Sequence, residues 1–456
     1  MLLPGSEVSP SMQASIKREG DGVSSKRAAR PAVRETGPWW THAGLTVAKG
    51  RLLIAGRDAE TLARGRGTPI YVYDLNRVGE QIEALQGAIR RHGLEARVRL
   101  ALKAQHEPEI LDYVRRDFGP GTDNGVGLDV CSPGEVQRAL ECGWPPEHIS
   151  YTGTNVSERD LEYLARYPIH INVDGLSQMR RVCRSLPGQP VGLRVNPQVG
   201  AAHGMGATSL YAGSKPTKFG VCPDKLGEAA EVARAFGTSI VTVHAHVARM
   251  ILDDDLANYE AFLLRFAQLV RTLQAAGCPV EEANVGGGLG VPTRPQDRPL
   301  NLDAVVALWK RHLEPLGVVV GCESGEFYFR ESAVLLAEVV SVEDKAGVTF
   351  VGLDVGWNAF NLPFIFSQHH DIVLAHAADS APQQIVTIAG HINQGPDLFA
   401  EDYPFPEVGE GDIVAIVGAG AYGQSSGLDT HCLRPQARAV FFSDRIVERP
   451  AATAVP

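Results

Sequence analysis

The chain has 456 residues, with 43 Lys and Arg against 53 Asp and Glu, so its formal net charge at neutral pH is −10. This acidic balance argues against a basic nucleic-acid binder and against a polybasic protein that docks on anionic membranes. Apolar residues make up 44% and charged residues 21%, which indicates a globular protein and excludes a disordered or fibrous one. The length suits two or three domains, because one (β/α)8 barrel takes about 250 residues.

The first 37 residues are rich in Ser, Arg, Lys, Glu and Gly and contain no apolar run long enough for a signal peptide or a membrane helix. We interpret residues 1–37 as a disordered leader and expect no membrane partner. The seven cysteines are odd in number and form no CxxC pair. This pattern is typical of reduced thiols in a cytoplasmic protein.

Short apolar runs alternate with helix-like stretches from about Ile70 to Glu323, which is the pattern of βα units. The clearest helix is predicted over 256–273, where apolar residues recur at three- and four-residue spacing. The predicted strands are 98–102, 126–130, 149–152, 169–173, 191–195, 240–246, 283–285 and 318–323. Eight such strands predict an α/β fold with a closed (β/α)8 TIM-like barrel over residues 69–325.

After the barrel the helical period disappears, and the predicted strands are 334–342, 348–353, 385–389, 413–417 and 437–442. We therefore expect residues 326–456 to form a C-terminal β domain, a Greek-key-like sandwich or barrel. Residues 38–68 contain Leu45, Val47, Leu52 and Ile54, and these N-terminal strands are expected to join the β domain.

In such a barrel the active site lies at the carboxyl ends of the strands, so polar residues that follow apolar runs are candidates. Lys103 follows a predicted strand and could form a Schiff base with a carbonyl, although a lone strand-end lysine is more often only solvated. Asp129 ends another strand. The next helix opens with Ser132 and Glu135, a pattern that helix capping explains by itself.

Three further strands end in residues suited to chemistry. His244 and His246 form an H-x-H pair, which could bind a metal, but no further ligands stand at a telling spacing. Gly286, Gly287 and Gly288 could turn backbone N–H groups towards a phosphate, and Glu323 could pair with a ring nitrogen. A lysine, a histidine, a glycine run and a carboxylate on four strands of one barrel together describe a pocket for pyridoxal phosphate.

The order of the motifs resembles the barrel-type (fold type III) pyridoxal-phosphate-dependent decarboxylases, the group of diaminopimelate and ornithine decarboxylases. The resemblance runs from about Gly67 to Phe442. The matching segments are Gly67–Asp74, Ala101–Ala104, Gly127–Ser132, Arg194–Pro197, Lys218–Gly220, His244–Val247, Gly286–Gly290, Gly321–Glu323, Asp354–Gly356 and Ala419–Gly423.

The resemblance implies a role for each matching residue. Lys103 would hold the cofactor, His246 would stack on its ring, and Glu323 would keep the ring nitrogen protonated. Gly286 to Gly288 and Tyr422 would bind the phosphate, and Asp129 lies in a matching cofactor-binding segment. We expect pyridoxal 5'-phosphate as the cofactor and no metal.

The chain departs from the family at two charged positions. The usual Glu-Pro-Gly-Arg is Glu323-Ser324-Gly325-Glu326 here, which replaces a cation with an acid. The His-Ile-Gly-Ser phrase is His246-Val247-Ala248-Arg249. We hypothesise that Arg249 supplies the charge that Glu326 removes, either to the phosphate or as the partner of Glu326.

The substrate positions differ as well. Diaminopimelate enzymes carry an Arg and a Tyr where this chain has Leu362 and Phe366, which cannot bind a carboxylate. Each lost partner costs about 1 to 3 kcal/mol when a charged group is buried without it. Diaminopimelate is therefore not the predicted substrate.

The family's Cys-Glu-Ser-x-Asp loop, which crosses from the partner subunit, aligns with 393–397. Its Cys and Glu are replaced by Asn393 and Gln394, whereas Asp397 is kept. In the family the Cys helps to protonate Cα after carbon dioxide has left. Here that proton would come from Lys103 or water, or the proton would reach a carbon other than Cα and give abortive transamination. The resemblance implies a homodimer with shared active sites.

We predict a decarboxylase that converts an α-amino acid to an amine and carbon dioxide. The acidic residues Glu326 and Asp397 favour a substrate with a basic side chain. A D-configured amino acid is a further candidate substrate. The alternative is a non-decarboxylating homologue that acts through a protein partner. A metal hydrolase built on His244 and His246 is the most distant alternative.

Overall fold

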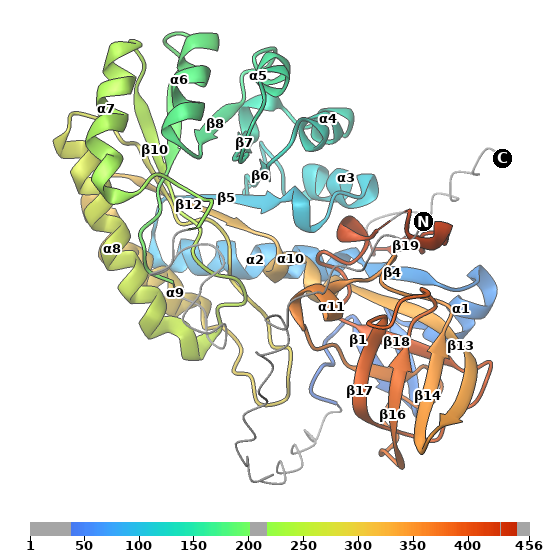
Figure 1. Cartoon of the computed structure of the whole chain (residues 1–456). Helices are drawn as coiled ribbons and strands as arrows, with labels where there is room; N and C mark the ends of the chain where they lie inside the picture. The colour runs from blue at the N-terminus through green and yellow to red at the C-terminus, as the bar shows by residue number, and fades with distance from the viewer. Residues whose placement is uncertain (1–37, 201–216, 429, 445–456) are drawn as a thin grey trace, which may run out of the picture.

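The computed structural model describes residues 38–200, 217–428 and 430–444, and the predicted leader lies outside these ranges. Eight parallel strands close into a barrel in which β12 pairs with β5 (Figure 1). Its strands are β5 (Ala96–Ala101), β6 (Gly127–Val130), β7 (Ile149–Tyr151), β8 (His170–Val173), β9 (Val191–Arg194), β10 (Ile240–His244), β11 (Glu282–Asn284) and β12 (Val319–Ser324). The predicted strands are confirmed in number and order.

Helices surround the barrel and carry their apolar side chains towards the strands. They are α2 (Leu75–His92), α3 (Pro108–Asp117), α4 (Pro133–Glu141), α5 (Glu158–Leu164), α6 (Leu176–Ser185), α7 (Leu226–Ala235), α8 (Leu256–Ala275) and α9 (Leu302–His312). The predicted helix is α8, in which Tyr259, Phe262 and Phe266 are buried on one face. None of the helices in the described ranges is long and apolar enough to cross a membrane.

Eight strands of the second domain form one mixed sheet, drawn in orange and red with β4 in blue (Figure 1). They are β4 (Ile70–Asp74), β13 (Ala333–Lys345), β14 (Val348–Leu353), β15 (Ile372–Leu374), β16 (Gln384–Ala389), β17 (Leu398–Phe405), β18 (Ile413–Val417) and β19 (Arg438–Phe442). The long strand β13 pairs with β4 and β18 in its first half and with β14 in its second half. One strand thus runs through the whole domain.

The first strand of the predicted barrel range belongs to this sheet instead. β4 pairs with β13 and β19, so the barrel begins at β5 and the range 69–325 starts too early. An apolar run by itself does not say which sheet it joins, because both sheets bury such runs. The strands β15 and β17 have no counterpart among the predicted strands.

The N-terminal strands β1 (Leu45–Ala48), β2 (Arg51–Ile54) and β3 (Arg57–Asp58) form a small sheet of their own. They contact the β domain mainly through side chains, since Leu45, Leu52 and Ile54 share an apolar cluster with Val72 and Val334. Helix α1 (Ala59–Arg66) then leads into β4. The predicted association with the β domain is therefore made by packing and by two backbone hydrogen bonds, from the Leu52 N–H to the Ala375 carbonyl and from the Ala378 N–H to the Gly50 carbonyl.

Two short helices and one loop connect the domains beside the barrel mouth. Helix α10 (Glu326–Phe329) follows β12, and α11 (Leu362–Phe366) belongs to the β domain. The loop after β18 returns to the barrel, where the Tyr422 N–H donates to the Ala104 carbonyl at 2.7 Å. This contact fixes a β-domain residue next to Lys103.

Candidate active site

A cavity of about 380 Å³ lies at the carboxyl ends of the barrel strands. Its lining includes eight of the nine residues predicted to bind the cofactor, all except Gly286: Lys103, Asp129, His246, Arg249, Gly287, Gly288, Glu323 and Tyr422. Glu326 and Phe366 line it too. Most of these residues follow barrel strands, as the strand-end argument predicts, whereas Phe366 and Tyr422 come from the β domain.

Lys103 lies in a short turn directly after β5, and its Nζ is 2.8 Å from the Asp129 Oδ2. Asp129 is buried in β6, while 42% of the Lys103 side chain is accessible. Burial alone would lower the pKa of the Lys103 ammonium, but the Asp129 carboxylate outweighs it and holds that pKa well above its usual value. The amine is therefore held in place as a cation that faces the cavity.

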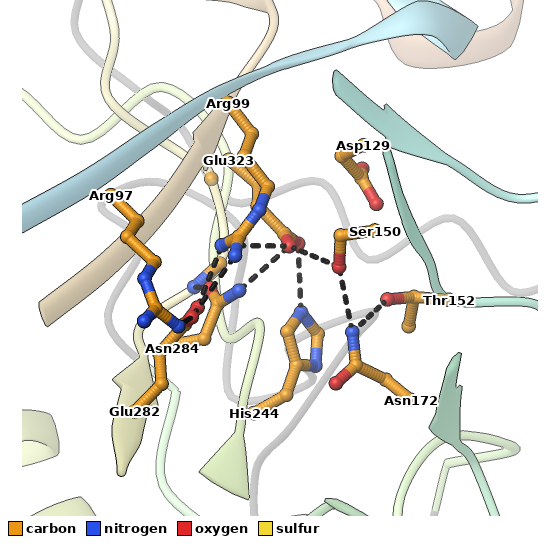
Figure 2. Close-up of polar contacts among 12 residues, drawn as sticks. Arg97, Arg99, Asp129, Ser150, Thr152, Asn172, His244, Glu282, Asn284 and Glu323 are labelled. Atoms are coloured by element: carbon orange, nitrogen blue, oxygen red, sulfur yellow. Dashed lines mark hydrogen bonds and ion pairs between the residues drawn. The ribbon is translucent and has the colours of Figure 1, made fainter. Parts of the chain in front are cut away.

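Glu323 in β12 is buried, and its carboxylate accepts hydrogen bonds from three strands (Figure 2). Asn284 Nδ2 and Ser150 Oγ donate to Oε1 at 2.6 and 3.3 Å, and His244 Nε2 is 3.0 Å from Oε2. Burial would raise the pKa of Glu323, but His244, Arg99 and Lys103 lower it below the ordinary range. Glu323 is therefore an anion at the cavity floor.

The two histidines of the H-x-H pair have separate tasks. His244 contacts Glu323, whereas His246 Nδ1 accepts the Gly287 N–H at 3.2 Å. Burial, followed by the Arg194 and Lys103 charges, lowers the pKa of His246 well below its usual value. A neutral, oriented imidazole fits a stacking role and does not fit the metal-hydrolase alternative, in which both rings would face one ion.

The glycine run follows β11 and packs tightly against its neighbours. A Cβ on Gly287 would lie 2.2 Å from the Glu323 carbonyl oxygen, and one on Gly288 would lie 2.5 Å from the Ala248 carbonyl oxygen. Gly286 has φ +72° and donates its N–H to Asn284 Oδ1 at 2.8 Å. Only glycine lets this backbone approach the cavity so closely.

Arg249 and Glu326 lie together at the cavity wall. Their closest side-chain atoms, Nη2 and Oε2, are 3.6 Å apart, and the Arg249 guanidinium is 4.3 Å from the centre of the Phe366 ring. Glu326 also accepts from Arg330 Nη1 at 2.9 Å and from Gln368 Nε2 at 2.8 Å. The hypothesis that Arg249 is a partner of Glu326 agrees with this arrangement.

The remaining predicted substrate residues lie apart from the cavity, with the exception of Phe366. Leu362 is fully buried in α11 and does not line the cavity of its own chain, so its substrate contact stays a prediction. Asp397 is also buried, and its carboxylate accepts the N–H groups of Trp357 and Ile392 at 2.8 and 2.6 Å. Its role within one chain is to hold this loop.

Asn393 and Gln394 are exposed on the same loop and do not line the cavity of their own chain. A loop from a partner subunit is the only way in which their predicted roles could apply. That contribution stays a prediction.

Several residues that line the cavity are not among those predicted from the sequence, such as Cys131, Thr154, Arg194, Phe219 and Met250. Arg194 ends β9, and its guanidinium lies 4.3 Å from the centre of the Phe219 ring. The position of Arg194 at the end of a predicted strand could have identified it as a site residue. Met250 and Phe219 lie in loops, where no periodic pattern marks them.

Comparison with known proteins gives a consistent result. Residues 75–329 match the family model described as "Pyridoxal-dependent decarboxylase, pyridoxal binding domain". A diaminopimelate decarboxylase of Methanothermobacter thermautotrophicus is 33% identical over 386 residues, which cover 82% of this chain and 86% of that protein. The crystal structure of the Helicobacter pylori diaminopimelate decarboxylase complexed with L-lysine matches with a TM-score of 0.75. It is 26% identical, and the match covers 85% of this chain and 94% of that one.

The barrel, its strand-end lysine and the β domain define a fold type III enzyme. The chain belongs to the pyridoxal-dependent decarboxylase family, and its cofactor is pyridoxal phosphate.

The residues present fit this cofactor. A carboxylate offers about four acceptor positions, and the described residues around Glu323 fill three of them. One position on Oε2 is left for a protonated ring nitrogen. Lys103 supplies the amine, neutral His246 supplies a flat ring, and Gly288 and Gly325 place side-chain-free backbone at the cavity wall.

Proposed function

We propose that this enzyme decarboxylates an α-amino acid other than diaminopimelate. The observation that carries the proposal is the cavity wall of Phe366 and Met250, beside an Arg249–Glu326 pair that neutralises itself. A second ammonium–carboxylate head at this wall would displace those contacts and lose its own hydration. Because the relatives are named diaminopimelate decarboxylases, diaminopimelate is the competing substrate and should be included in every assay.

The basic tail expected from Glu326 and Asp397 loses support, since both carboxylates already have partners, although Glu326 Oε2 accepts no hydrogen bond from the described residues and lies 3.6 Å from Arg249 Nη2. Glu326 contacts Arg330 and Gln368, and Asp397 accepts two backbone N–H groups. Desolvating a free cation next to Arg330 and Arg249 would cost more than Glu326 could return. We therefore expect a substrate with an uncharged, partly apolar side chain. Preferred turnover of a basic or a D-configured amino acid would correct this expectation.

Each cavity residue has a defined part in this reaction. When bound, pyridoxal phosphate supplies the electron sink that accepts the electron pair left on Cα after carbon dioxide departs. Lys103 binds the cofactor and is placed to return a proton, because Asp129 holds its amine at the cavity edge. Glu323 keeps a proton at the ring nitrogen, which stabilises the developing negative charge. His246 orients the ring.

We also propose a cytoplasmic homodimer in which the loop with Asn393 reaches the partner's cavity. Asn393 and Gln394 are exposed and do not line the cavity of their own chain, which supports this arrangement. The free state of all seven cysteines suits a reducing compartment.

The test is carbon dioxide release from a panel of apolar, polar, acidic, basic and D-configured amino acids and diaminopimelate. Turnover of an apolar or uncharged substrate with the highest kcat/KM is expected. Lys103→Ala is the matched control, and borohydride reduction should attach cofactor to wild-type Lys103 and leave the variant unlabelled. Preference for diaminopimelate would overturn the substrate proposal, and silence across the panel with cofactor bound would favour the non-decarboxylating alternative.

A further inference from the structure

The barrel interior beneath the cavity contains charged residues where a packed barrel normally holds apolar ones. Arg99 in β5 donates from Nη1 and Nη2 to the two carboxylate oxygens of Glu282 in β11, at 2.6 and 3.0 Å. Arg97 Nη1 donates to the same carboxylate at 2.8 Å. Figure 2 shows this group next to Glu323.

The network is built into the barrel. Glu282 is 1% exposed and Arg99 9% exposed, so both charges are removed from water. A Cβ on Gly321 would lie 2.3 Å from the Glu282 Oε1, so the absence of a side chain at Gly321 makes room for this carboxylate. Burying a carboxylate is costly unless it is fully paired. Arg97 and Arg99 provide this pairing for Glu282.

Arg99 stands at an unusual distance from Glu323. Its Nη1 is 3.9 Å from the Glu323 Oε1, which is too long for a hydrogen bond but close enough for a strong charge interaction in a buried site. Glu282 holds the guanidinium in this place through two parallel bonds. Without the charge of Glu282, Glu323 would be the nearest carboxylate to which Arg99 could turn.

We propose that Glu282 is a positioning residue for the cofactor: it holds Arg99 near enough to Glu323 to keep that carboxylate ionised, and too far from Oε1 to pair with it directly and compete with the ring nitrogen on Oε2 for its negative charge. The inference rests on the proposed function for its catalytic consequence, but its direct readout needs no substrate. It adds a function to two residues that do not touch the cavity.

The other groups that face Glu323 do not replace this control. His244 from β10, Asn284 from β11 and Ser150 from β7 each hold one acceptor position, and the Lys103–Asp129 pair lies above. Arg99 is the neighbouring group that is always charged. In line with this, burial works against the charge of Glu323, and His244, Arg99 and Lys103 together keep its pKa low.

The test compares three cofactor-loaded variants with wild type: Glu282→Gln, Glu282→Gln with Arg99→Met, and Glu331→Gln. The last is a matched control, because it removes the acid of another arginine pair, Arg77–Glu331, outside the barrel interior. NMR of the isotope-labelled ring nitrogen reports its protonation, and absorbance titration gives the dissociation constant of the cofactor. Circular dichroism confirms that each variant is folded.

In Glu282→Gln we expect the ring nitrogen to lose its proton at neutral pH and the cofactor to bind at least about tenfold more weakly, because the released Arg99 pairs directly with Glu323 and competes with the ring nitrogen for its negative charge. The double variant should regain the protonated ring, since the competing cation is absent, and Glu331→Gln should resemble wild type. A purely structural role predicts no such recovery.

A protonated ring in folded Glu282→Gln would overturn the inference, as would a double variant that behaves like the single one. Should Glu282→Gln fail to fold, the comparison passes to Arg99→Met, in which the inference predicts a protonated ring with a lower pKa than in wild type. An unchanged pKa there would overturn it equally. If the ring states follow expectation while no amino acid is turned over, the inference stands and the proposed function fails.

Discussion

The departures from the family at two single residues compensate each other in space. Arg249 stands where the family has Ser, Glu326 stands where it has Arg, and the two side chains are 3.6 Å apart. The cation has therefore moved to another strand end, where it faces an added carboxylate, and the two positions together carry no net charge where the family has one positive charge.

Arg249→Ser should weaken cofactor binding at least about tenfold, because a charge-assisted hydrogen bond contributes about 1.5 to 3 kcal/mol. The exchange Arg249→Ser with Glu326→Arg restores the family arrangement and should recover most of the affinity. Absorbance titration of the apoenzyme with pyridoxal phosphate measures both. Unchanged affinity in Arg249→Ser would show that this guanidinium does not contribute to cofactor binding.

At the scale of elements, the site depends on how β6 passes into α4. Ser132 Oγ accepts the Glu135 N–H at 3.2 Å, which caps the helix as the sequence predicts. The Glu135 carboxylate, however, accepts the Cys131 N–H at 2.7 Å and so reaches one residue beyond the cap. The cap thus also fixes the strand end that carries Asp129.

Ser132→Ala should lower the free energy of unfolding by about 1 kcal/mol, because one N–H group of the first helical turn loses its acceptor. Thermal unfolding followed by circular dichroism would record a lower transition temperature. Ser132→Thr keeps the hydroxyl and should fall between wild type and Ser132→Ala. Equal transitions in all three proteins would contradict a stabilising cap.

At the scale of the whole molecule, the cavity is made by both domains. Lys103 and Glu323 come from the barrel, whereas Phe366 and Tyr422 come from the β domain. The Tyr422 N–H contact with the Ala104 carbonyl keeps the two parts in register. Neither domain alone would enclose the substrate.

If the proposed dimer shares its active sites, two inactive variants should complement each other. Lys103→Ala lacks the amine, and Asn393→Trp would block a partner's cavity with a bulky ring. Mixed after reversible dissociation, they should regain up to about a quarter of wild-type activity, because one site of the mixed dimer is intact. Sedimentation velocity should show a dimer throughout. A monomer, or no recovery in verified mixed dimers, would refute the shared site.

Much of this protein is determined by the sequence alone. The alternation of apolar runs and helical periods predicts the eight barrel strands, because period and spacing are local properties of the chain. The strand-end rule and the order of motifs point to Lys103, His246 and Glu323, which the fold brings to one cavity.

Only the tertiary structure decided which charges remain available. The sequence cannot tell that Asp397 binds its own backbone, that Glu326 is shared by arginines or that Leu362 lies inside α11. It also cannot assign β4 to the second sheet. These properties depend on contacts between residues far apart in the chain, where burial and pairing set the free energy of a charge and local pattern does not.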